Sequence, residues 1–175
     1  MFDNYLKNLA SLKEEETIEA VVRHHWFTFM PSFIKIIILP LALFVLIYMF
    51  GFMSFLTLLN SVIFSYLALI IFLIWLAFSF YHWFIWYFDV GILTNQRIIV
   101  IDQKGLFEKS VSGAELDKIQ DVTVNIKGLA PTLLGYGSLI AQTAGEMPNL
   151  IIKDTAHPAE IQRKILHLKN TKKEN

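Results

Sequence analysis

The chain has 175 residues, and its 15 Lys and Arg are balanced by 15 Asp and Glu, so its formal net charge of zero at pH 7 argues against a general nucleic-acid binder. Cysteine is absent, which excludes disulfides and thiolate metal sites. Hydrophobic residues make up 55% of the chain and its mean hydropathy is +0.51, which is high for an ordinary soluble domain.

Residues 1–32 are expected to form a cytoplasmic amphipathic helix followed by a juxtamembrane segment. Near the start, apolar residues recur at helical spacing: Phe2, Tyr5, Leu6, Leu9 and Leu12. Residues 14–16 are all Glu and are interpreted as a solvated turn, and the β-branched pattern of residues 17–22 predicts a short strand. His24 and His25 are adjacent, so they would point to opposite faces of a strand, which argues against a metal pair.

Residues 36–88 contain no Asp, Glu, Lys or Arg. A bilayer core of about 30 Å needs roughly 20 apolar residues for one helical crossing. The stretch therefore predicts a transmembrane hairpin over residues 33–83, with spans at about 33–52 and 62–83. Because His82, near a span end, is the single residue of the stretch other than tyrosine with a titratable side chain, we expect an anchor rather than a transport path.

Basic residues lie at both ends of the hairpin, and the connecting turn has none: Arg23 precedes it, Lys35 lies at its very start, and Arg97, Lys104 and Lys109 follow it. The positive-inside rule then predicts a multi-pass protein of the cytoplasmic membrane with both termini in the cytoplasm. Four aromatic residues fall where the spans should meet the headgroups and are predicted to be interface anchors: Trp26, Trp83, Trp86 and Tyr87.

Residues 84–169 change to short β-rich runs and predict about six antiparallel strands followed by one helix. Strands are expected at 97–101 and 106–112 around a turn at 102–105, at 119–126 before a break at 128–131, and at 138–143 and 150–153. Pro158 is suited to the first position of a helix with an apolar stripe of Ile161, Ile165 and Leu168, and residues 170–175 are expected to be a disordered tail. The predicted fold class is an α+β membrane protein, in which a two-helix hairpin precedes a small β-barrel or sandwich capped by a C-terminal helix.

Several motifs, taken in order, resemble bacterial pleckstrin-homology-like (PH-like), membrane-flanked domains: residues 93–99 (LTNQRII), 104–107 (KGLF), 116–124 (LDKIQDVTV), 135–139 (GYGSL) and 143–145 (TAG). The resemblance covers about residues 84–168, and the hairpin with residues 23–26 (RHHW) is typical of the small two-span members. It implies two near-orthogonal antiparallel sheets capped by a helix, and a non-enzymatic role. Eukaryotic relatives of the fold bind phosphoinositides through a basic cluster in the first hairpin loop, where this chain offers Lys104 and Lys109 beside Asp102 and Glu108.

The sequence therefore predicts a membrane-anchored interaction module that meets lipid headgroups or a protein partner at the cytoplasmic face. Arg97, Lys104 and Lys109 are the candidate contacts, each contributing about 1 kcal/mol near an anionic surface. For Arg97, an ion pair with a carboxylate such as that of Asp121 is the favoured interpretation.

The alternative is a non-catalytic subunit of a larger membrane complex of the export, stress or antimicrobial-resistance type. There a membrane-protein partner or a second copy of the chain would pack against the hairpin. No Ser/His/Asp grouping, phosphate-binding glycine loop or metal-ligand spacing is found, so we expect no enzyme activity, cofactor, metal or small-molecule substrate.

Overall fold

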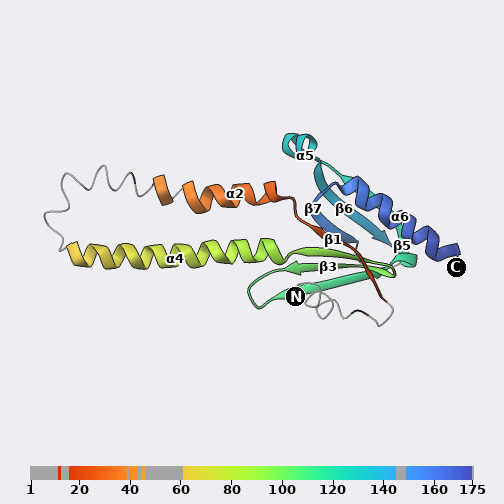
Figure 1. The fold of residues 1–175 in the computed structure, drawn as a ribbon, viewed down its shortest axis with the longest axis horizontal. Helices are drawn as coiled ribbons and strands as arrows, with labels where there is room; N and C mark the ends of the chain where they lie inside the picture. Colours follow the sequence, from red (N-terminus) through yellow and green to blue (C-terminus); the bar gives the residue numbers. More distant parts are fainter. Residues whose placement is uncertain are drawn as a thin grey trace. The chain divides into compact units, whose positions relative to one another are not determined.

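The structure is a computed structural model that describes residues 12, 16–38, 40–42, 45, 61–144 and 149–174. The chain divides into two compact units (Figure 1). The first comprises Met1–His25 together with Ile85–Asn175 and is called the β-unit here; the second, Trp26–Phe84, is called the apolar segment. The predicted N-terminal helix lies outside the described residues, apart from Leu12.

The β-unit contains two antiparallel sheets, as predicted. The first sheet has the order β1-β2-β3-β4, with bounds Ile18–Arg23, Val90–Thr94, Arg97–Gln103 and Lys109–Glu115. The second has the order β5-β6-β7, with bounds Ile119–Asn125, Tyr136–Thr143 and Leu150–Ala156. A short 3-10 turn, η3 (Leu116–Lys118), connects them. The strand predicted at residues 17–22 is confirmed, and β7 is three residues longer than expected.

The division of the chain differs from the predicted one because β1 belongs to the β-unit rather than to a separate juxtamembrane segment. It pairs with β2 in antiparallel register, with Arg23 opposite Val90 and Val22 opposite Gly91. The apolar segment is therefore an insertion between two neighbouring strands of one sheet. Local sequence patterns carry no information on such a pairing, because the two strands are separated by the whole insertion.

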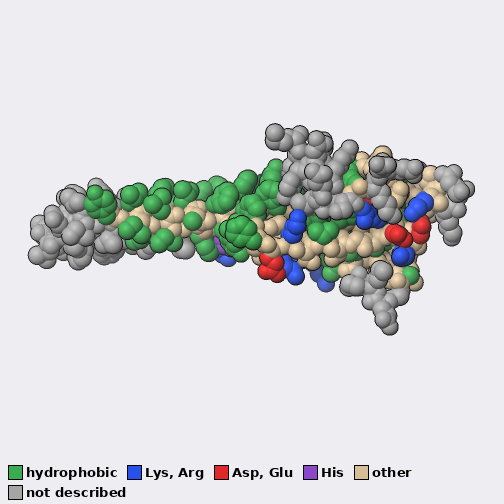
Figure 2. Space-filling view, turned by 90° about the horizontal axis from the view of Figure 1, so that it is seen from below, with side chains coloured by type: hydrophobic (Ala, Val, Ile, Leu, Met, Phe, Trp, Pro, Cys, Tyr) green, Lys and Arg blue, Asp and Glu red, His purple; other side chains and the backbone are tan. Residues whose placement is uncertain are grey.

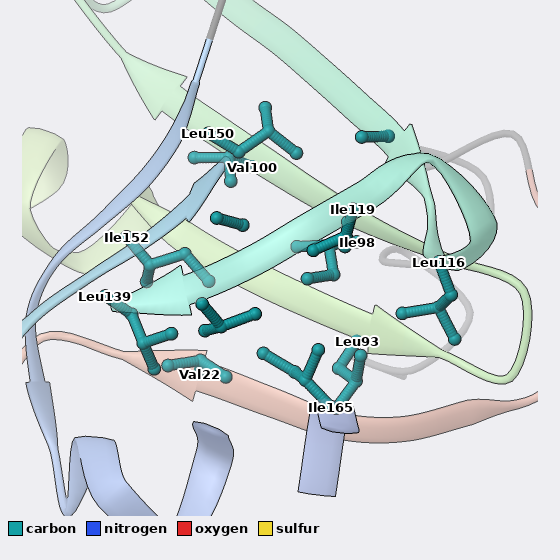
Figure 3. Close-up of a cluster of buried hydrophobic side chains, with 13 residues drawn as sticks. Val22, Leu93, Ile98, Val100, Leu116, Ile119, Leu139, Leu150, Ile152 and Ile165 are labelled. Atoms are coloured by element: carbon teal, nitrogen blue, oxygen red, sulfur yellow. The ribbon is translucent and has the colours of Figure 1, made fainter. Parts of the chain in front are cut away.

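The main core lies between the two sheets and packs against the final helix α6 (Pro158–Glu174) (Figure 3). Ile98 and Val100 of β3, Leu139 of β6 and Ile165 of α6 meet there, and all four are buried. Ile161 and Leu168 pack against the same cluster, which confirms the predicted apolar stripe. The helix continues to Glu174, so residues 170–174 are helical where a disordered tail was expected.

A second cluster covers the other face of the first sheet and consists of Val90, Ile92, Ile99 and Ile101, with Leu12 and Ile18 packed against it. Strands β2 and β3 are thus buried on both faces. This explains their continuous apolar sequences, because a strand with one solvated face would alternate between apolar and polar residues.

Two local elements differ from the sequence expectations. The β3–β4 turn is formed by residues 104–108 and not by residues 102–105. The N–H groups of Lys104 and Gly105 close it, since both donate to the Glu108 carbonyl at 3.0 Å. The expected break at 128–131 is largely a short helix, α5 (Leu129–Leu134). It ends at Gly135 in the left-handed region, with φ at 69°, which favours glycine.

The apolar segment begins with three short helical pieces, η1 (Trp26–Phe29), α2 (Met30–Phe33) and η2 (Ile34–Ile38). Most of the predicted first span lies outside the described residues. The second span corresponds to α4 (Ser61–Phe88), which extends five residues beyond the predicted end at Trp83. Within α4, Leu69–Phe88 is the one stretch in the described part of the chain that is long and apolar enough to cross a bilayer, with a hydropathy of 1.9.

Gly137 in β6 offers a direct test of sheet packing. A Cβ at this position would lie 2.8 Å from the Asn125 carbonyl oxygen and 2.9 Å from Ile126 Cγ1. We expect Gly137→Ala to lower the free energy of unfolding by about 1–3 kcal/mol, because backbone must move to relieve the overlap. Chemical denaturation of the detergent-solubilised protein measures the change. Gly105→Ala is the matched control, because its Cβ would meet only Glu108 Cβ at an ordinary 3.7 Å, and equal losses in the two variants would contradict the prediction.

Candidate functional site

The end of the β-unit that connects to the apolar segment is defined by strand register. Arg23 at the end of β1 lies opposite Val90 at the start of β2, and Val90 lies opposite Ile101 of β3. The β3–β4 turn follows just beyond Ile101, so it belongs to the same end. We call this the connection end, because both covalent links to the apolar segment leave the β-unit there.

Two histidines after β1 join the sheets at the connection end. His24 forms an isolated bridge with Thr155 of β7, and its Nε2 lies 3.2 Å from Asp89 Oδ2. The contact is an ion pair when the imidazole is protonated. The His25 N–H donates to the Asp154 carbonyl at 2.7 Å.

The His25 ring stacks on Tyr136 at the start of β6, with ring centroids 4.9 Å apart and 8° between the planes. The end of β1 is therefore fixed to both neighbouring strands of the second sheet. Next to it, the guanidinium carbon of Arg23 lies 5.2 Å from the centre of the Tyr87 ring, within the range of a cation–π contact.

A small hollow opens beside His24 and is lined by Asp89, Gly91, Ile152 and Lys153 among others. It holds about 200 Å³ including its open mouth, whereas small-molecule pockets typically have about 300–1,000 Å³. Lys153 Nζ lies 4.0 Å from Asp102 Oδ1, so the positive charge at the rim is already balanced. The hollow is therefore a weak candidate for ligand binding.

The three predicted basic contacts do not lie together. Lys104 and Lys109 are exposed and flank the β3–β4 turn at the connection end. Arg97 lies at the opposite end of the sheet, at the start of β3. Its Nε and Nη2 donate to Glu16 Oε1 and Oε2 at 2.9 and 3.0 Å.

Arg97 thus forms the expected ion pair, but its partner is Glu16 and not Asp121. The Glu16 side chain is fully buried, where a solvated turn was expected for residues 14–16, and it also accepts a 2.7 Å hydrogen bond from Thr94 Oγ1. Asp121 instead faces solvent and lies 3.4 Å from the Thr123 hydroxyl. This geometry gives Arg97 a structural role in holding residue 16 against the β2–β3 turn.

The predicted interface aromatics occupy both units. Trp26 of η1 and Trp83 of α4 lie in the apolar segment and are exposed, whereas Trp86 and Tyr87 lie in the β-unit and are half-buried. Trp26 packs edge-on against Phe27, with ring centroids 5.8 Å apart. Trp83 packs against Phe80 with the rings tilted by 38° and their centroids 5.9 Å apart. Exposed indole rings beside an apolar helix are typical of the headgroup region of a bilayer.

Sequence reasoning missed two exposed apolar tips at the connection end. The first is the β3–β4 turn, where Leu106 is exposed and Phe107 is as exposed as in an extended chain, at 101%. The second is α5, where Leu129 and Leu133 are 83% and 80% exposed. The i, i+4 spacing of these two leucines was the available signal, but Gly128 and Pro131 suggested a loop instead.

The chain matches a family described as "Bacterial PH domain" over residues 32–169. The match includes residues 32–84 of the apolar segment, β2 to β7 and α6 as far as residue 169, while β1 precedes it. No curated protein matches the chain.

The similar solved structures include two that each align with 46% of this chain. One is a DUF1696-family protein with a pleckstrin-homology domain from Shewanella loihica PV-4, with 21% identity, a TM-score of 0.38 and 70% of that protein covered. The other is a pleckstrin homology domain from Shewanella amazonensis SB2B, with 22% identity, a TM-score of 0.37 and 66% covered. Because the family match spans well over half of the sequence, this chain belongs to the bacterial PH domain family.

Proposed function

We propose that this protein is a membrane-anchored interaction module whose PH-like β-unit is held at the cytoplasmic face of the cell membrane. The role is binding rather than catalysis, in keeping with a family that is generally an interaction module. The site in question is the connection end, where Lys104 and Lys109 are exposed.

The observation that carries the proposal is the insertion of the apolar segment between β1 and β2. Since these strands are hydrogen-bonded neighbours, the residues just before and just after the insertion lie on the same side of any membrane. A segment with both ends on one side crosses a bilayer an even number of times or not at all. Two crossings suit the stretch without charged side chains at residues 36–88, which exceeds twice the roughly 20 residues of one span.

The surface of α4 supports the same conclusion. Large apolar side chains are exposed around the helix, including Ile70, Ile71, Phe72 and Ile74, and hydrophobic atoms cover this unit in Figure 2. A helix that is apolar on all sides belongs in a protein core or in a lipid bilayer. Since none of the Leu69–Phe88 window is buried, a bilayer is the better environment.

Orientation rests on the flanking charges. Lys35 lies before the long apolar stretch, and Lys104 and Lys109 follow it, which favours a cytoplasmic β-unit by the positive-inside rule. Confinement at the membrane raises the effective concentration of nearby ligands, so weak contacts suffice for binding.

Topology is testable because the natural chain has no cysteine. We expect a membrane-impermeant maleimide to label Asn60→Cys, in the predicted turn between the spans, in intact cells. Asn170→Cys on α6 should react only after the membrane is permeabilised. Labelling of Asn170→Cys in intact cells, or recovery of the protein in the supernatant after ultracentrifugation without detergent, would overturn the proposal.

The alternative, a subunit of a larger membrane complex, predicts a different result after extraction. In mild detergent a stoichiometric protein partner would then co-purify with the chain. A single species that still binds vesicles favours the membrane module.

A further inference from the structure

We infer that the two exposed apolar tips of the connection end dock into the headgroup layer of the membrane that anchors the protein. The tips are Leu106–Phe107 in the β3–β4 turn and Leu129–Leu133 on α5. This inference rests on the proposed membrane anchoring and names the surface that the β-unit contacts: an anionic lipid bilayer.

Both tips lie at the connection end of the β-unit. The β3–β4 turn follows Ile101, which is opposite Val90, the neighbour of Arg23. Helix α5 immediately precedes Tyr136, whose ring stacks on His25 just after β1. In Figure 1, α5 lies at the upper left of the β-unit and the turn between β3 and β4 at its lower left, so both lie toward its left end.

The connection end has to face the bilayer if the apolar segment spans that bilayer. Both chain links, at residues 25–26 and 84–85, leave the β-unit here. Arg23 and Val90 lie opposite each other in the β1–β2 register, and β1 is fixed to the second sheet through His24. The connection end is therefore kept within a few residues of the membrane surface.

Each tip combines exposed apolar side chains with lysines that are close to them in sequence. Phe107 lies between Lys104 and Lys109 in sequence, and Lys127 stands just before α5. All three lysines are exposed, and within the described residues none of them forms an ion pair. Glu108 is the acidic residue in the turn itself, while Asp102 lies 4.0 Å from Lys153 and Asp89 lies 3.2 Å from His24.

Apolar side chains flanked by cations match the interface of an anionic bilayer, where rings and aliphatic chains enter the acyl boundary and ammonium groups meet phosphates. A protein groove would also accept Phe107, but it would leave the two leucines of α5 uncovered unless it spanned both tips. A bilayer surface covers both at once.

The test uses the full chain with single cysteines at Phe107→Cys, Leu133→Cys or Asn170→Cys, each carrying an environment-sensitive fluorophore. The proteins are reconstituted into vesicles of phosphatidylglycerol and phosphatidylcholine, with or without spin-labelled lipid. We expect blue-shifted emission and several-fold stronger quenching by the spin label at positions 107 and 133 than at position 170, because Asn170 lies near the far end of α6. Removing Lys104 or Lys109 by alanine substitution should weaken the docked state about fivefold per lysine, as judged by the quenched fraction.

The outcomes separate the inference from the proposed function. Failure of the protein to float with vesicles would overturn the anchoring itself. Flotation with equal quenching at all three positions would overturn the docking and leave the anchoring intact. A third outcome is a blue shift that grows with the protein-to-lipid ratio while the spin-labelled lipid causes no quenching. It would assign the tips to a contact with a second copy of the chain and overturn the lipid assignment.

Discussion

Replacing Arg97 with alanine is expected to lower the free energy of unfolding of the β-unit by about 3–5 kcal/mol, the usual cost of removing one partner of a buried ion pair. Glu16 has a fully buried side chain, and Arg97 is 27% exposed and donates to both of its carboxylate oxygens. Without the guanidinium, the carboxylate would keep only the Thr94 hydroxyl among these contacts. A buried charge that has lost its ionic partner is strongly unfavourable.

Denaturant unfolding of the full chain in detergent measures this effect. The double variant Glu16→Leu/Arg97→Met should lose much less than Arg97→Ala, because it leaves no buried charge behind. Lys118→Ala is the surface control, since its pair with Glu115 at 3.3 Å is half-exposed on both sides and should contribute less than about 1 kcal/mol. If Arg97→Ala lowers the free energy of unfolding no more than Lys118→Ala does, the buried ion pair does not stabilise the β-unit and the prediction is wrong.

The network around Arg97 shows where sequence patterns stop being informative. A run of three Glu residues reads as solvent-exposed, yet Glu16 is buried because Thr94 and Arg97 lie next to it in the folded chain. These two residues are separated from Glu16 in sequence by the whole apolar segment. An ion pair for Arg97 could be anticipated from its position at a strand end, but the identity of its partner depended on the tertiary fold.

Elements with a strong local signal were predicted well. Ile98–Ile101 form a buried strand because a continuous β-branched run suits a sheet that is covered on both faces. Helix α6 begins at Pro158 as expected, since proline favours the first helical turn. Both signals arise within a few residues of the element that they specify, and the family match agrees with the PH-like fold.

The candidate site was only partly predictable for the same reason. Lys104 and Lys109 were identified because charge is visible in the sequence. The exposure of Phe107 was not, because an isolated apolar residue in a β-rich region is usually part of the core. Helix α5 was not predicted because Gly128 just before it and Pro131 within it are residues typical of loops. In the structure Gly128 has a φ of 107° and precedes the first residue of the helix.

The insertion between β1 and β2 predicts that residues 88–175 do not fold alone, although they contain six of the seven strands found in the described residues, and helix α6. This fragment lacks Val22, which is buried in the main core, and the edge strand that pairs with β2. It also lacks Glu16 and so removes the partner of Arg97. Losing Val22 costs about 1.5–3 kcal/mol and breaking the ion pair about 3–5 kcal/mol. Together with the lost strand pairing, these costs approach the whole stability of a typical domain, about 5–15 kcal/mol.

Residues 12–25 joined to residues 88–175 by a flexible linker of roughly six Gly and Ser residues should restore folding, since such a linker reaches about 12–15 Å. That distance is sufficient because Arg23 and Val90 are paired neighbours. We expect a cooperative denaturant transition and dispersed amide resonances for the linked chain, and neither for residues 88–175. Val22→Asp in the linked chain is the matched control and should abolish the transition, because it places a carboxylate in the apolar core. Equal cooperative unfolding of the fragment and the linked chain would mean that β1 merely lies against a domain that is complete without it.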